Sequence, residues 1–317
     1  MNKIEDLRIE EIFELATKNS KNNELQIAEN LYYQILEINP NHINSLNNLG
    51  SIFNDLGQND KAIRSYQKAI KLNPNFFNPS YNLGLIFFSI KEYNKALDCF
   101  KKAVEIKPTF ADAQFNLGVV YKNLDNYQKA MDCFKAVIEL NPNYLEAHNN
   151  LGVSFKSLGF YKKAIYCYEK VIEIDPNYVG AYNNIGVVLL IIENNQGAKI
   201  KFEKAIEIDP SFSHSYWNLH SLASSIDEAI TILKKLLTID PTYIKAKIMI
   251  SALRGYQGNF DEFNSILLSS ELNHPYTRSV KWVFSLPKLP KLFFNRWNFP
   301  QNLIYFFFIL NVIRYIS

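Results

Sequence analysis

The chain has 317 residues, of which 48% are hydrophobic and 21% are charged, so it has the composition of a folded protein rather than a disordered one. The formal net charge of +3 is unevenly placed, because the last acidic residue is Glu271 and six Lys and Arg residues follow it. Taking those six from 34 leaves 28 basic against 31 acidic residues, which argues against a nucleic acid as partner.

Residues 1–8 are charged and contain no apolar run of the kind found in a signal peptide. We therefore expect them to form an N-terminal cap on the segment that follows.

From Ile9 onward the sequence repeats with a period of 34 residues, and each copy closes on a proline. One copy is shortened by a three-residue deletion, after which the period returns to 34. The copies end at Pro40, Pro74, Pro108, Pro142, Pro176, Pro210, Pro241 and Pro275. A period of this length is typical of stacked supersecondary units, so residues 9–275 are predicted to form one array.

We number the residues of each copy so that position 1 is the third residue after the preceding proline. Small and aromatic residues then recur at fixed positions. Position 8 is glycine in five successive copies, position 20 is alanine in seven, and position 24 is aromatic in six. Positions 4, 7, 8 and 11 share one helix face, and positions 20, 24 and 27 share a second. In the fifth copy the first face consists of His148, Leu151, Gly152 and Phe155. Each copy is therefore predicted to be two closely packed helices, the second of which ends at the proline.

This combination of positions resembles the tetratricopeptide repeat, and the resemblance covers roughly residues 9–275. It implies an all-α fold, a right-handed superhelix (solenoid) of about seven to eight antiparallel helix pairs. Because such arrays present a concave surface to another chain, the resemblance implies a scaffold that binds proteins or extended peptides. We expect no cofactor.

Asparagine recurs at position 6, away from the apolar face. The six residues are Asn48, Asn82, Asn116, Asn150, Asn184 and Asn218. Asparagine lowers helix stability by about 0.6 kcal/mol relative to alanine. Its recurrence therefore indicates that the side chain has a structural or binding role. One acceptor and two donors on each amide suit the backbone of an extended peptide, and we predict that these side chains bind peptide. Two alternatives stay open, hydrogen bonding between adjacent repeats and survival from a recent duplication.

The asparagine ladder resembles the one that lines the tetratricopeptide superhelix of the nucleocytoplasmic O-linked sugar transferases, whose groove takes extended substrate chains. The likeness is limited to the six asparagines. Position 5 varies, and its aromatic residues Tyr81, Phe115 and Trp217 either border the same groove or complete the packing between helices.

The array contains no pattern that predicts catalysis. The five histidines are scattered, and there is no HExxH, no Gly-rich phosphate loop and no GxSxG. Cys99, Cys133 and Cys167 occupy one repeat position, so we expect them about 10 Å apart on stacked helices, too far for a disulfide or a shared metal. We predict a non-enzymatic protein in a reducing, cytoplasmic compartment.

Residues 276–317 depart from the repeat. The segment up to Asn298 is aromatic and basic, and it resembles the connector between tetratricopeptide arrays and an S-adenosylmethionine-dependent methyltransferase domain in some bacterial proteins. No cofactor loop follows, so one hypothesis is an out-of-frame end that leaves the substrate-recruiting part of a glycosyltransferase or methyltransferase. A second hypothesis is a helix that caps the last repeat. A third is peripheral membrane contact through Leu303–Ile313, whose 11 residues are too few for a span of about 20.

Overall fold

The computed structural model describes residues 3–257, and every regular element in that range is helical. The helices are α1 Lys3–Lys21, α2 Leu25–Ile38, α3 Ile43–Asp55, α4 Asn59–Leu72, α5 Phe77–Ser89, α6 Tyr93–Ile106, α7 Ala111–Asn123, α8 Tyr127–Leu140, α9 Leu145–Ser157, α10 Tyr161–Ile174, α11 Val179–Ile191, α12 Asn195–Ile208, α13 Ser213–Leu219, α14 Ile226–Ile239 and α15 Ile244–Tyr256. Each odd-numbered helix is the first of a repeat and each even-numbered helix the second. The predicted all-α solenoid is therefore confirmed over this range, while Pro275 and the tail 276–317 lie outside the described residues.

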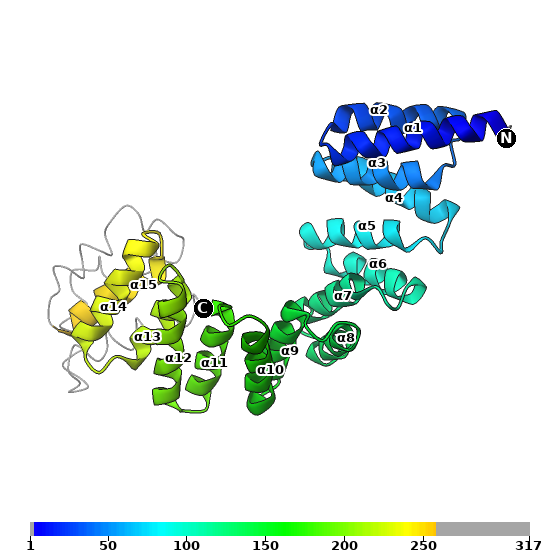
Figure 1. Cartoon of the computed structure of the whole chain (residues 1–317). Coiled ribbons are helices and arrows are strands. Elements are labelled where there is room, and N and C mark those ends of the chain that lie inside the picture. The colour runs from blue at the N-terminus through cyan, green and yellow to red at the C-terminus, as the bar shows by residue number, and fades with distance from the viewer. Residues whose placement is uncertain (1–2, 258–317) are drawn as a thin grey trace, which may run out of the picture. The chain divides into compact units, whose positions relative to one another are not determined.

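The chain forms two compact units, Met1–Asp175 and Pro176–Ser317. In the first unit, α1 to α10 follow one another in space as in sequence (Figure 1). Each odd-numbered helix there packs on the even-numbered helix of its own repeat, and α2, α4, α6 and α8 each also pack on the helix that follows. In the second unit α11 to α15 also pack successively. In both units every repeat is stabilised by its neighbours, as in other solenoids.

The small residues at positions 8 and 20 and the aromatic residue at position 24 form the centre of each repeat. The rings at position 24 are at most 2% exposed, and they belong to Tyr32, Tyr66, Phe100, Phe134, Tyr168 and Phe202. A Cβ added to the glycine at position 8 would lie 2.5–2.7 Å from the ring of the same repeat, at Gly50, Gly84, Gly118, Gly152 and Gly186. Glycine recurs because a buried aromatic ring fills the space that a Cβ would need.

The turn between the two helices of a repeat uses one backbone conformation six times. The residue at position 15 has φ between 55° and 79° in Asn23, Gly57, Lys91, Asp125, Gly159 and Glu193. This left-handed region suits glycine, and Asn and Asp tolerate it, whereas it costs about 1–2 kcal/mol in an ordinary L-residue such as Lys91. Glycine at this position in two copies, Gly57 and Gly159, is the sequence signal for this turn conformation.

Replacing Lys91 by glycine is expected to stabilise the protein. Lys91→Gly removes the strain of φ 63° at an exposed turn, and we expect the free energy of unfolding to rise by up to about 1 kcal/mol. Urea denaturation followed by circular dichroism measures it. Lys68→Gly, an exposed site within α4, is the matched control and should lose about 1 kcal/mol. A loss of stability in both variants would contradict the strain argument.

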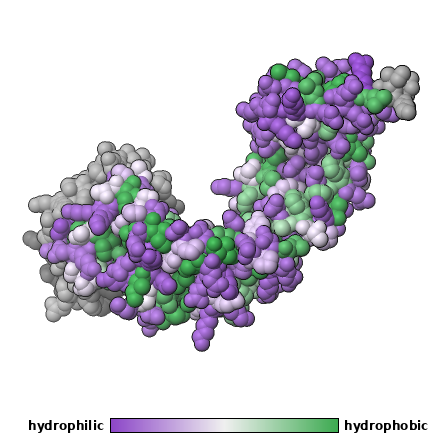
Figure 2. Space-filling model, viewed as in Figure 1, coloured by the Kyte–Doolittle hydropathy of each residue, from purple (hydrophilic) through white to green (hydrophobic). Residues whose placement is uncertain are grey.

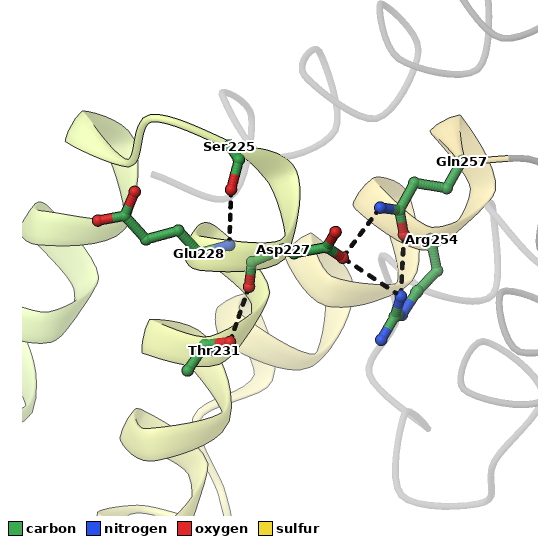
Figure 3. Close-up of polar contacts among 6 residues, drawn as sticks. All are labelled: Ser225, Asp227, Glu228, Thr231, Arg254 and Gln257. Carbon is green, nitrogen blue, oxygen red and sulfur yellow. Dashed lines mark hydrogen bonds and ion pairs between the residues drawn. The ribbon is translucent and has the colours of Figure 1, made fainter.

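The three-residue deletion shortens α13 to seven residues, and a 3-10 turn, His220–Leu222, follows it. The next helix, α14, starts with a side-chain cap, because the backbone N–H of Glu228 donates to Ser225 Oγ at 3.1 Å (Figure 3). Asp227 then connects α14 to α15, accepting a hydrogen bond from Gln257 Nε2 at 3.1 Å and lying 3.8 Å from Arg254 Nη1 (Figure 3). These contacts preserve the helix pairing beyond the deletion.

Exposed hydrophobic side chains occur mainly as isolated patches. On the face seen in Figure 2, green patches alternate with hydrophilic purple areas. One set is periodic: the aliphatic residue at position 14 is 37–45% exposed in five repeats, at Leu56, Ile90, Leu124, Leu158 and Ile192. Single exposed apolar residues are normal for a folded protein and indicate no binding site by themselves.

Candidate functional site

The six asparagines at position 6 are all half-buried and lie on the odd-numbered helices. Three of them make the same hydrogen bond across a repeat boundary, in which Nδ2 donates to a side-chain oxygen at position 5 of the preceding repeat. The pairs are Asn82 to Asn47 at 3.4 Å, Asn116 to Tyr81 at 3.2 Å, and Asn218 to Asn183 at 2.9 Å. For these three residues the structure shows the inter-repeat bonding that the sequence left open.

Two further asparagines have different partners. Asn48 Nδ2 donates to the hydroxyl of Tyr32 at 2.9 Å. Asn150 Nδ2 donates to the carbonyl of Glu146 at 2.8 Å, and its Oδ1 accepts from Lys122 Nζ at 2.6 Å. Asn184 occupies the equivalent place on α11 and is also half-buried. Asn48, Asn82, Asn116, Asn150 and Asn218 thus each bond to their own or the preceding repeat.

The inter-repeat bond leaves part of each amide unused. An amide has two N–H donors and a carbonyl acceptor, and the bond to position 5 uses one donor. Among residues 3–257, no group donates to the side-chain oxygen Oδ1 of Asn116 or Asn218. One side chain can therefore hold two repeats together and still offer a donor and an acceptor to a ligand. Peptide binding by the six asparagines stays a prediction.

The position-5 aromatics pack between helices and remain half-buried. Each contacts the aromatic residue directly before the next odd-numbered helix. The ring centroids are 4.8 Å apart for Tyr81 and Phe110, 5.3 Å for Phe115 and Tyr144, and 5.6 Å for Trp217 and Tyr243. They complete the packing between helices, and their uncovered parts keep the groove prediction open.

Position 4 forms a second recurrent contact that the repeat pattern did not reveal. His148 belongs to the face predicted as apolar, yet its ring is half-buried and its Nε2 lies 2.8 Å from the carbonyl of Pro142. Two tyrosine hydroxyls at this position donate to the preceding proline in the same way, Tyr182 to Pro176 at 3.1 Å and Tyr216 to Pro210 at 3.2 Å. In the sequence, this hydrogen bond is indicated by a side chain with a polar end six residues after the proline.

The odd-numbered helices α7 and α9 carry opposite charges at their two ends. Asp112 and Glu146 lie in the first turns, and Lys122 and Lys156 lie in the last turns, both at position 12. Both lysines are half-buried, and burial lowers the pKa of each. A lysine at position 12 distinguishes the fourth and fifth repeats from the first three.

A pocket of about 830 Å³ lies between α8, α9 and α10. His148 contributes to it from α9, and Tyr166, Cys167 and Lys170 contribute from α10. Tyr166 is 60% exposed, while burial raises the pKa of the Cys167 thiol to about 12, so this thiol is neutral at physiological pH. The pocket is the principal competing candidate for a binding site.

Residues 3–257 contain no cluster of three His, Cys, Asp or Glu side chains suited to a metal ion. Within the same range, no helix has the length and apolarity needed to cross a membrane.

Models of known protein families match part of the repeat array. Models described as tetratricopeptide repeats match residues 31–64, 111–144, 145–178 and 167–199, and a TPR repeat model matches residues 50–90 and 84–125. The chain belongs to the tetratricopeptide-repeat family. These matches confirm the resemblance of the array to the tetratricopeptide repeat.

Solved structures of the tetratricopeptide-repeat family are similar to this chain. YrrB, described as a TPR protein with an unusual peptide-binding site, is 26% identical over 58% of this chain and 95% of its own, with a TM-score of 0.54. MamA is 34% identical over 51% of this chain and 95% of its own, with a TM-score of 0.50. PilF of Pseudomonas aeruginosa, at 17% identity over 70% of this chain and 100% of its own, shares the fold with a TM-score of 0.59. No curated protein matches the sequence.

Proposed function

We propose that this tetratricopeptide-repeat protein is a non-catalytic scaffold that binds extended peptide segments of a partner protein along its odd-numbered helices. The observation that carries the proposal is the row of half-buried position-6 amides, two of which keep an acceptor and a donor without a described partner. The similarity to YrrB, a TPR protein with a peptide-binding site, supports it.

The spacing of the repeats fits an extended ligand. Packed helices lie about 8–10 Å apart, and an extended chain advances about 3.3 Å per residue, so successive asparagines meet its backbone about every third residue. Apolar side chains at position 9 lie on the same helices: Leu85 is 38% exposed, and Val119 and Val153 are half-buried. Binding would combine backbone hydrogen bonds with apolar contacts to some ligand side chains.

Asn116→Ala and Tyr81→Phe form a matched pair that tests this function. Each variant removes the same inter-repeat hydrogen bond, so each should cost about 1 kcal/mol of stability. Asn116→Ala also removes the amide that we assign to the ligand, so it should weaken peptide binding about tenfold, or about 1.4 kcal/mol, whereas Tyr81→Phe changes affinity little. Fluorescence anisotropy with peptides selected from a phage-displayed library on the immobilised protein measures both.

Two results would contradict the proposal. Equal losses of affinity in the two variants would mean that Asn116 acts through the repeat boundary alone. Failure of the library to yield any peptide that binds the protein in solution would argue against peptide binding as the function.

We place the scaffold in the cytoplasm, in keeping with its three free thiols, whose pKa values burial raises to about 11 for Cys99 and about 12 for Cys133 and Cys167. The alternatives of transferase recruitment and membrane contact depend on residues 276–317, outside the described residues, and no observation favours them.

A further inference from the structure

A lysine ammonium lies at the level of the asparagine row in the middle of the first unit. Lys122, at position 12 of α7, donates from Nζ to Asn150 Oδ1 on α9 at 2.6 Å, across the boundary between the fourth and fifth repeats. Helical side chains point back toward the N-terminus of their helix, which lets the lysine reach the position-6 residue of the next repeat. The neutral amide fixes the ammonium but does not neutralise it, and two of the three N–H donors remain.

No described carboxylate compensates this charge. Among residues 3–257, Lys122 and Lys156 form no ion pair. The acids at position 2 of the same helices, Asp112 and Glu146, lie ten residues away, about 15 Å along the helix axis. Asp112 also accepts a hydrogen bond from the Tyr144 hydroxyl at 3.2 Å. The C-terminal end of a helix favours a cation but supplies only a partial negative charge.

Burial makes the missing counter-charge significant. Loss of solvent around both lysines lowers the pKa of each, and no neighbouring carboxylate contributes to either shift. A half-buried charge without an opposite charge beside it is unfavourable, and an anionic ligand would relieve that cost. Position 12 is uncharged in the first three repeats, at Ser20, Asn54 and Phe88, so the feature is local.

The spacing of the two lysines defines the ligand. Residues at one position of adjacent repeats lie about 10 Å apart, the distance between packed helices. In a polyproline II peptide, residues i and i+3 face the same side and are about 9.3 Å apart, whereas in a β-strand same-face residues are about 6.6 or 13 Å apart. A polyproline II backbone also makes no hydrogen bonds of its own, so its amides are free to bind the asparagines.

We propose that the fourth and fifth repeats bind an acidic peptide segment with two Asp or Glu residues three positions apart, with one carboxylate at Lys122 and the other at Lys156. Asn150 is a positioning residue that holds the Lys122 ammonium. This inference rests on the proposed function, since it assigns the chemistry of the peptide that the groove binds.

The test uses three fluorescein-labelled peptides of one proline-rich background, carrying Glu-x-x-Glu, Gln-x-x-Gln or two adjacent Glu residues. With the full chain in ~0.1 M NaCl, the Glu-x-x-Glu peptide should bind about tenfold more tightly than either of the others. In ~1 M NaCl, where the Debye length falls from about 10 to about 3 Å, this preference should shrink. Lys122→Met with Lys156→Met keeps the aliphatic stems and should abolish the preference.

The matched control is Lys68→Met with Lys102→Met, which changes the net charge equally at exposed sites on α4 and α6 and should leave the preference intact. Equal binding of the Glu-x-x-Glu and Gln-x-x-Gln peptides would overturn the acidic preference while leaving peptide binding in place. Equal binding of the two Glu peptides would overturn the spacing. Failure of all three to bind, while library-selected peptides do, would overturn the inference alone, and failure of both kinds would overturn the proposed function as well.

Discussion

Phe134→Ala is expected to lower the free energy of unfolding by about 3–5 kcal/mol, the usual cost of deleting a fully buried aromatic ring. The Phe134 side chain is 0% exposed and fills the space beside Gly118 between α7 and α8. It also packs against Phe115, with ring centroids 5.7 Å apart. Because each repeat of a solenoid contacts only its neighbours, damage to a central repeat should also weaken the coupling between the repeats on either side.

Urea denaturation followed by far-ultraviolet circular dichroism measures both effects, as an earlier midpoint and a broader or two-step transition. Tyr166→Ala is the control, because this aromatic residue on the neighbouring α10 is 60% exposed and should cost no more than about 0.5 kcal/mol. A similar small loss in both variants would show that the position-24 ring is not the centre of its repeat.

Gly118→Ala should destabilise the protein by about 1–3 kcal/mol, although alanine is normally the better helix former by about 1 kcal/mol. The added Cβ would lie 2.7 Å from Cε1 of Phe134 and 3.1 Å from Cβ of Cys133. Both neighbours are buried, so neither can move aside without disturbing the packing of α7 on α8. The sign of the effect, opposite to that of helix propensity, makes this variant informative.

Gly180→Ala is the matched control for Gly118→Ala. The atoms nearest to its Cβ would be those of the half-buried Tyr178 ring, at 3.1 Å, so the change should be neutral or slightly stabilising. In a double-mutant cycle, Gly118→Ala combined with Phe134→Leu should lower the free energy of unfolding by less than the sum of the two single changes. The smaller leucine side chain leaves room for the added Cβ. Additive losses would contradict a direct contact.

The helix pairs were predictable because their causes recur in the sequence. Glycine at position 8, alanine at position 20 and a ring at position 24 are one packing solution repeated, and the structure shows the contact that links Gly118 to Phe134. The turn conformation could be predicted for the same reason, because Gly57 and Gly159 occupy the position at which Lys91 and Glu193 also adopt positive φ. Local constraints with a fixed period are readable from one chain.

The contacts across repeat boundaries were not predictable in the same way. The bond from Asn116 to Tyr81 depends on how one helix pair is rotated against the next, which periodicity does not specify. The bond from Lys122 to Asn150 was missed for another reason: position 12 changes type along the array, so a search for recurring residues passes over it. Features confined to one or two repeats require three-dimensional information.

Photo-crosslinking tests most directly whether peptide binds along the odd-numbered helices. A benzophenone side chain replaces Val119 on α7, beside the asparagine row, and in a second variant replaces Tyr166, in the pocket between α8 and α10. With a labelled peptide selected on the wild-type protein, we predict crosslinking from position 119 that excess unlabelled peptide abolishes, and none from position 166. Competable crosslinking from position 166 alone would place the ligand in the pocket and contradict the account.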